Sequence, residues 1–173
     1  MKLSARVTVL LLGVVAALTM VVPTVAQGAT RSGSGVLASP PPGVAYQLIN
    51  RGRGQCLAGQ KSNRVNMFRC EGTYTDQFWL LEPIGQPGFF RLRNLSNSKC
   101  LAIISNGNVR VSGCEDTFDD QWWRLDPTPD SNAYQLYNHL RGTCLAAPSA
   151  NGAATSFTCE PIYADQGWTF VPR

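Results

Sequence analysis

The chain has 173 residues, a formal net charge of +4 and 44% hydrophobic residues, which suffices for one domain with a hydrophobic core. Charged residues make up 15% of the chain and include no run of Lys or Arg, so nucleic acid is not an expected partner. Beyond the amino terminus, the sequence contains no apolar segment long enough to span a membrane.

The first 26 residues predict a secretory signal peptide. Lys2 and Arg6 precede an apolar run over residues 7–22, and small residues follow at about 26–29, where cleavage is expected. The run is short for a membrane span, and an uncleaved anchor is the alternative. We therefore expect a secreted, extracellular protein without membrane attachment after cleavage. In such a protein, Asn94-Leu95-Ser96 matches the acceptor sequence for N-linked glycosylation.

Residues 27–43 are rich in Gly, Ser and Ala and end in Pro40-Pro41-Pro42. A segment of this composition buries too little apolar surface to offset the entropy lost when the chain is ordered. We therefore expect a flexible leader with a stiff proline end, followed by one domain over residues 46–173.

A motif of Asp-Gln-x-Trp occurs three times in this domain, and its glutamines are 44 and 45 residues apart. Each copy ends a longer frame, in which Cys-Leu-Ala comes first, Cys-Glu follows 14 or 15 residues later, and an aromatic residue stands between Cys-Glu and the motif. Repetition at a fixed period is typical of a domain built from equivalent units. We predict three pseudo-symmetric repeats, which span residues 46–89, 90–133 and 134–173.

Each repeat contains four short runs of nearly alternating apolar and polar residues, separated by Gly and Asn, and no sustained helical period follows residue 44. This pattern predicts an all-β fold with four strands per repeat. A propeller blade has a similar length, but propellers usually have at least four blades. We therefore predict a closed barrel with threefold pseudo-symmetry, whose strands are 46–50, 56–58, 65–69, 78–81, 90–94, 100–103, 108–111, 123–125, 134–138, 144–147, 155–157 and 168–170.

The six cysteines occupy equivalent places in the repeats. Six cysteines allow 15 pairings, and the symmetry favours one bridge inside each repeat, worth about 3 kcal/mol by chain entropy. A zinc site is the alternative, but no two cysteines lie closer than 14 residues and His139 is the only histidine. We expect no metal and no other cofactor, and we predict the disulfides Cys56–Cys70, Cys100–Cys114 and Cys144–Cys159.

The Trp and Gln of the repeated motif have a structural interpretation. Trp79, Trp123 and Trp168 are related by the pseudo-axis, so their rings can pack into one shared core. The glutamines can satisfy backbone groups where strands leave the barrel, because buried amides need hydrogen-bond partners. They can also contact a ligand, and both interpretations stay open for Gln77, Gln121 and Gln166.

Three in-register copies of Cys-Leu, Cys and Gln-x-Trp over residues 46–173 resemble the ricin-B-type β-trefoil lectins. The resemblance implies a β-trefoil of three four-stranded repeats of about 44 residues. It also implies a secreted carbohydrate-binding module without catalysis, whose partner is a saccharide or a glycan polymer, and we expect a monomer. In that family, an Asp after Cys-Leu binds sugar hydroxyls, an aromatic residue two places before the second Cys stacks on the sugar, and an Asn or Asp precedes the Gln.

This chain departs from the family at the first position, where Ala58, Ala102 and Ala146 replace the Asp. Ser112 replaces the aromatic residue in repeat two, so we expect sugar binding only in repeats one and three. Lost carboxylate bonds, at about 1.5–3 kcal/mol each, would make that binding weak. The predicted site residues are Asn66, Phe68, Asp76 and Gln77, with Thr155, Phe157, Asp165 and Gln166. A relocated pocket could also use Gln60 and Asn63, or Ser149 and Asn151.

The sequence gives no pattern typical of an enzyme. One histidine leaves no second candidate for a Ser-His-Asp triad, and Glu71, Glu115 and Glu160 recur once per repeat, whereas glycoside hydrolysis uses one asymmetric pair of carboxylates. The three alanines favour a second hypothesis, in which the trefoil has lost sugar binding and binds a protein as an inhibitor or a complex subunit. A structural cell-surface component is the third.

Overall fold

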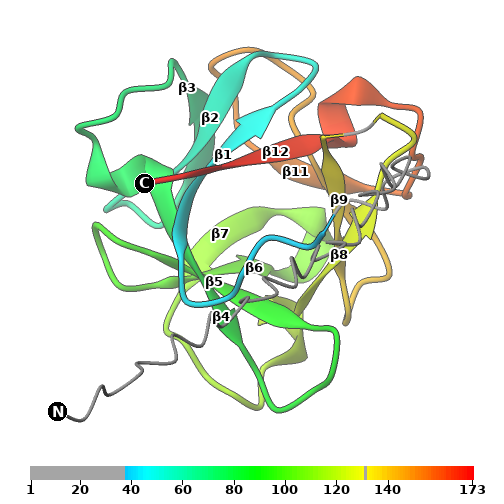
Figure 1. The fold of residues 1–173 in the computed structure, drawn as a ribbon. Coiled ribbons are helices and arrows are strands. Elements are labelled where there is room, and N and C mark those ends of the chain that lie inside the picture. The colour runs from blue at the N-terminus through cyan, green and yellow to red at the C-terminus, as the bar shows by residue number, and fades with distance from the viewer. Residues whose placement is uncertain (1–37, 131) are drawn as a thin grey trace, which may run out of the picture. The chain divides into compact units, whose positions relative to one another are not determined.

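The computed structural model describes residues 38–130 and 132–173 as an all-β domain (Figure 1). All twelve predicted strands are present, and their ends differ from the prediction by at most two residues. The predicted signal peptide and most of the leader lie outside the described residues. The strands are β1 (Ala45–Asn50), β2 (Gln55–Gly59), β3 (Val65–Phe68), β4 (Phe78–Pro83), β5 (Phe90–Asn94), β6 (Cys100–Ile103), β7 (Val109–Ser112), β8 (Trp123–Pro127), β9 (Tyr134–Asn138), β10 (Cys144–Ala146), β11 (Thr155–Phe157) and β12 (Trp168–Pro172).

Single-turn 3₁₀ helices, which the sequence pattern did not predict, contain the Asp-Gln pair of each repeat. The described helices are η1 (Thr75–Gln77), η2 (Ser105–Gly107), η3 (Asp119–Gln121) and η4 (Ala164–Gln166). None of the helices in residues 38–130 and 132–173 is long and apolar enough to cross a membrane.

Six strands form a closed barrel through the antiparallel pairs β1–β4, β4–β5, β5–β8, β8–β9, β9–β12 and β12–β1. The first and last strands close the ring, since Tyr46 pairs with Pro172 and Asn50 pairs with Trp168. The other six strands form the hairpins β2–β3, β6–β7 and β10–β11, which contact one another through isolated bridges. This arrangement is the predicted β-trefoil.

The three tryptophans of the repeated motif lie in the core, and their side chains are fully buried. Each indole nitrogen donates a hydrogen bond to the carbonyl of the leucine in Cys-Leu-Ala of the same repeat. The distances are 2.9 Å from Trp79 to Leu57, 2.9 Å from Trp123 to Leu101 and 3.0 Å from Trp168 to Leu145. Each ring therefore joins a barrel strand to its own hairpin and satisfies its one polar atom inside the core.

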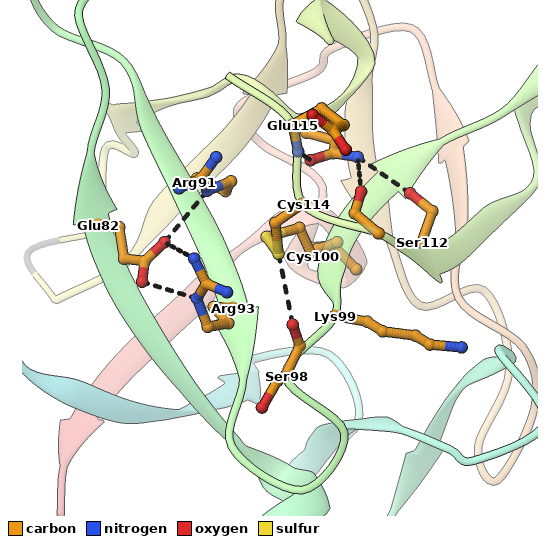
Figure 2. Close-up of a disulfide and its surroundings, with 12 residues drawn as sticks. Glu82, Arg91, Arg93, Ser98, Lys99, Cys100, Ser112, Cys114 and Glu115 are labelled. Carbon is orange, nitrogen blue, oxygen red and sulfur yellow. Dashed lines mark hydrogen bonds and ion pairs between the residues drawn. A yellow bond between two sulfur atoms is a disulfide. The ribbon is translucent and has the colours of Figure 1, made fainter. Parts of the chain in front are cut away.

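The structure contains one disulfide in each repeat, Cys56–Cys70, Cys100–Cys114 and Cys144–Cys159. Figure 2 shows the second of these beside an ion pair that joins β4 to β5, in which Glu82 accepts from Arg91 and Arg93. Burial alone would raise the pKa of Glu82, but hydrogen bonds from the two arginines and their charges outweigh burial and lower it.

A buried asparagine joins each repeat to the preceding one. Asn94, at the end of β5, donates from Nδ2 to the carbonyl of Asp76 at 2.7 Å and accepts at Oδ1 from the amide of Ser96 at 3.1 Å. Asn138 binds the carbonyl of Asp120 in the same way, and Asn50 binds that of Asp165, each at 2.7 Å. Since Asn94 is fully buried, its Asn-Leu-Ser sequence is not accessible to glycosylation in the folded domain.

The last six leader residues, 38–43, belong to the described part and contact the barrel. The hydroxyl of Tyr46 donates to the carbonyl of Pro41 at 2.9 Å, and that of Tyr134 donates to the carbonyl of Ala38 at 2.8 Å. The amide of Gly43 donates to Leu81 at 2.7 Å. Residues 38–43 therefore belong to the folded domain, although they precede the first repeat.

Candidate functional site

Two equivalent pockets lie on the side of the domain, one in repeat one and one in repeat three. The first has a volume of about 310 Å³ and is lined by Gln60, Phe68, Arg69, Glu71, Tyr74, Asp76 and Gln77. The second has a volume of about 360 Å³ and is lined by Phe157, Thr158, Glu160, Tyr163, Asp165 and Gln166. Every residue that lines the second pocket has its equivalent in the lining of the first, at six positions of the repeat. We call these two equivalent pockets the lateral pockets.

An aromatic pair lines each lateral pocket. Phe157 and Tyr163 are 49% and 54% exposed, and Tyr74 is 57% exposed, whereas Phe68 is half-buried. Phe118 of repeat two is also 51% exposed, so the second ring of the pair, Phe68 or Phe157, is what distinguishes the two lateral pockets. Neighbouring aromatic rings that are open to solvent form a patch typical of a contact surface. Tyr74 and Tyr163 were not among the predicted site residues, although an aromatic residue at this position of every repeat was visible in the sequence.

The glutamine of each repeat supports the floor of its pocket. Gln77 is buried, accepts from the amide of Glu71 at 2.8 Å and donates to the carbonyl of Arg69 at 2.8 Å. Gln166 makes the same two bonds with Glu160 and Thr158, at 2.8 and 2.9 Å. These bonds hold the backbone on both sides of the second cysteine, so each glutamine fixes the shape of its pocket. Contact of either amide with a ligand stays a prediction.

The carboxylates of Asp76 and Asp165 are half-buried, and neither has a hydrogen bond or ion pair with another side chain within the described ranges. They are therefore free to accept hydrogen bonds from a ligand in the pocket. The equivalent carboxylate in repeat two differs, because Oδ1 of Asp120 is buried without a partner among the described residues. Burial raises the pKa of Asp120, the charge of Asp119 raises it further, and Arg141 partly offsets both.

Repeat two lacks the aromatic wall that Phe68 and Phe157 provide. Ser112 stands at that position, and its hydroxyl accepts a hydrogen bond from Nε2 of Gln121 at 3.0 Å (Figure 2). The glutamine also donates to the carbonyl of Gly113 at 2.6 Å. Gln121 accepts from the amide of Glu115 as well, so it holds the backbone on both sides of Cys114 as the other glutamines do at theirs. The absence of sugar binding in repeat two stays a prediction.

The structure separates the predicted site residues into two places. Asn66 lies on the outer face of β3 but lines a different pocket, and the hydroxyl of Thr155 points to the carbonyl of Gly107 at 3.5 Å. Of the residues proposed for a relocated pocket, Gln60 lines the first lateral pocket. Two others bind neighbouring side chains, since Asn63 accepts from Lys99 and Asn151 accepts from Gln55. Ala58, Ala102 and Ala146 are fully buried.

Comparison with known proteins identifies the family. The family model described as "Ricin-type beta-trefoil lectin domain" matches residues 44–168. The chain belongs to the ricin-type β-trefoil lectin family. None of the curated proteins matches it in sequence.

Solved structures with the same fold resemble this lectin domain at low sequence identity. The designed threefold-symmetric protein ThreeFoil is 22% identical, with a TM-score of 0.65 over 73% of this chain and 97% of that one. The BEL β-trefoil is 20% identical, with a TM-score of 0.66 over 78% and 96%. SeviL, solved with asialo-GM1 saccharide, is 21% identical, with a TM-score of 0.62 over 73% and 95%. These likenesses support the fold of the lectin domain.

Within the described part of the lectin domain, no group of three or more His, Cys, Asp or Glu side chains is placed to hold a metal ion. Aromatic rings, carboxylates and the amide of a glutamine line both lateral pockets.

Proposed function

We propose that the lectin domain binds a saccharide, without catalysis, through the lateral pockets of repeats one and three. The observation that carries this proposal is the recurrence of six equivalent residues around both pockets, including an aromatic pair and two carboxylates. A sugar ring has an apolar face that can stack on Phe68 or Phe157, and its hydroxyls can donate to carboxylates. Glu71 and Asp76 supply the carboxylates in repeat one, and Glu160 and Asp165 supply them in repeat three.

Binding at each pocket should be weak. Ala58 and Ala146 replace the carboxylate that the family uses to hold two hydroxyls, and Gln60 offers only a neutral group in its place. Two pockets on one chain give avidity on a polymer with repeated sugars, because the second binding event is intramolecular. A glycan polymer therefore fits this domain better than a free monosaccharide.

The proposal includes secretion of the protein and the absence of catalysis. Disulfides persist in oxidising compartments, and each repeat contains one. The Glu and Asp of each lateral pocket recur in all three repeats, as expected of a repeated binding surface and not of one active site.

A glycan array and polysaccharide pull-downs test the proposal with Phe68→Ala, Phe157→Ala and the double variant. Loss of a stacked aromatic ring should weaken each pocket by roughly tenfold, and the double variant should lose retention on the polymer. Phe118→Ala is the matched control, because Phe118 is 51% exposed at the position of Tyr74 and Tyr163, but in repeat two.

Two outcomes would contradict the proposal. Full retention by the double variant would place sugar binding elsewhere on the domain. No binding to any glycan on the array, together with specific capture of a secreted protein, would favour the protein-binding alternative that the three alanines suggest.

A further inference from the structure

A third pocket lies where the three hairpins meet on the pseudo-threefold axis. Isolated bridges join the hairpins in a ring, Arg64 to Arg110, Asn108 to Thr155, and Ala153 to Asn66. The pocket has a volume of about 240 Å³ and is lined by Arg64, Val65, Asn66, Asn108, Val109, Arg110, Ala153 and Ala154. Val65, Val109 and Ala154 are buried and form the floor of this axial pocket, and their strand neighbours point outward.

Two arginines face each other in the axial pocket. Residues opposite each other in an antiparallel bridge point to the same side, so Arg64 and Arg110 bring two positive charges together. Like charges at opposite positions destabilise a sheet. Among the described residues, neither guanidinium forms a hydrogen bond or an ion pair, and the lining of the pocket contains no carboxylate.

The lack of a partner for the guanidinium group distinguishes Arg64 and Arg110 from the other eight arginines in residues 38–130 and 132–173. Arg53 and Arg141 donate to backbone carbonyls, and Arg173 lies over the ring of Phe78. The remaining five form ion pairs with carboxylates: Arg51, Arg69, Arg91, Arg93 and Arg124. The two arginines without a partner are therefore the two that share one pocket.

The hairpin segments carry a positive charge beyond these two residues. The segments 51–68, 95–112 and 139–158 contain seven Lys or Arg and no Asp or Glu. Lys99 extends away from the disulfide in Figure 2 and donates to Asn63 at 2.5 Å, directly beside Arg64 in the sequence. In addition, Oδ1 of Asn66 is buried beside the axial pocket without a hydrogen-bond partner among the described residues, so the lining of the pocket includes an unsatisfied polar group.

We propose that the axial pocket binds the anionic group, sulfate or carboxylate, of an acidic saccharide. Arg64 and Arg110 bind the oxygens of the anion, since guanidinium groups match planar and tetrahedral oxyanions with paired hydrogen bonds. The anion also removes the repulsion between the two arginines.

The axial pocket is connected to the first lateral pocket by one strand. Asn66 and Phe68 alternate with the core residues Val65 and Met67 along β3, and Arg64 directly precedes this strand. Arg64, Asn66 and Phe68 therefore lie on the same outer face, about 13 Å from first to last. An acidic glycan can therefore reach both pockets at once. The axial pocket itself does not depend on the lateral pockets, and its binding can be measured without them.

Dextran sulfate, carboxymethyl dextran and unmodified dextran test the proposal, because they share one backbone and differ in charge. Immobilised polymers should retain the protein only when they carry an anion, and the comparison of the two charged forms identifies the preferred group. Arg64→Gln and Arg110→Gln should each weaken retention by about tenfold, as expected for a lost charge-assisted bond. The double variant Arg124→Gln/Arg173→Gln has the same net charge as Arg64→Gln/Arg110→Gln and controls for general attraction, because neither Arg124 nor Arg173 lines the axial or the lateral pockets.

A second measurement checks that the variants fold and that the pocket binds a free ion. At matched ionic strength, inorganic sulfate should raise the unfolding midpoint of the parent protein above that of Arg64→Gln/Arg110→Gln, because only the parent binds the ion. Without sulfate, the variant should unfold at the same temperature as the parent or higher, since the repulsion is gone.

The proposal is overturned if the control variant loses as much retention as Arg64→Gln/Arg110→Gln, which would indicate general charge attraction. Equal retention on dextran and its charged forms would also overturn it. Loss of neutral-glycan binding in Phe68→Ala/Phe157→Ala, with dextran sulfate still bound, would support both sites separately.

Discussion

Substitution of Asn94 by Ala should strongly destabilise the domain, although the residue contacts no ligand. Asn94 is fully buried at the junction of repeats one and two, and its side chain binds the carbonyl of Asp76 at 2.7 Å and the amide of Ser96 at 3.1 Å. Alanine leaves the Asp76 carbonyl without its side-chain donor, whereas Ser96 is exposed and its amide can bind water. A buried polar group left unpaired costs about 1–3 kcal/mol, and the lost bond to the Asp76 carbonyl adds about 1 kcal/mol, since water replaces Asn94 at the Ser96 amide.

We therefore expect Asn94→Ala to lower the free energy of unfolding by about 2–4 kcal/mol. For a domain of this size, that loss corresponds to a fall in the unfolding midpoint of roughly 8–16 °C. Urea titration and thermal unfolding followed by circular dichroism measure both quantities. Asn108→Ala is the matched control, because Asn108 is exposed and forms no side-chain hydrogen bond among the described residues.

The pseudo-symmetry extends this prediction to the equivalent asparagines of the other two repeats. Asn50 and Asn138 form the same bonds with the preceding repeat, so their alanine variants should lose a similar free energy, within about 1 kcal/mol. A loss below about 1 kcal/mol at Asn94, or a loss no larger than that of Asn108→Ala, would refute the role assigned to these asparagines.

Two further predictions concern stability. Asp120→Asn should raise the unfolding midpoint at neutral pH, because burial and Asp119 raise the pKa of Asp120 and so disfavour its charged form in the folded state. The gain in the unfolding midpoint should shrink as the pH falls from the raised pKa of Asp120 in the folded state to its ordinary pKa in the unfolded state. Below the ordinary pKa, Asp120 is protonated in both the folded and the unfolded state. A gain that does not depend on pH would contradict this origin. Replacement of both Cys100 and Cys114 by Ala opens a loop of 14 residues and should lower the free energy of unfolding by about 3 kcal/mol, measured by urea titration under oxidising conditions. An unchanged urea midpoint would show that the hairpin contacts, and not the bridge, hold this repeat together.

The sequence predicted the architecture well because the fold is repeated. Three in-register copies of each cysteine, glutamine and tryptophan show which residues occupy equivalent places, and short alternating runs indicate strands directly. The closure of the barrel by β1 and β12, and the contacts of residues 38–43 with Tyr46 and Tyr134, depend on segments far apart in the chain. The pattern of residues within a short segment of the sequence does not predict such contacts.

The candidate site was predicted only in part. Phe68 and Asp76 do line one pocket, but Asn66, two residues before Phe68 on the same face, belongs to another. Two residues of a strand span roughly 7 Å, which is enough to separate neighbouring sites. The meeting of Arg64 and Arg110 could not be predicted, because they lie 46 positions apart on different hairpins and only the packing of the repeats places them together.

The closure of the barrel also fixes how many repeats, and hence how many lateral pockets, one domain can contain. A solenoid can gain binding sites by adding repeats at its ends, because its ends stay open. Here β12 pairs with β1, and Asn50 binds the carbonyl of Asp165, so the third repeat already occupies the interface that a fourth would need. More than three lateral pockets therefore require whole additional domains or several chains on one polymer, and within a single domain a lateral pocket is gained or lost one repeat at a time.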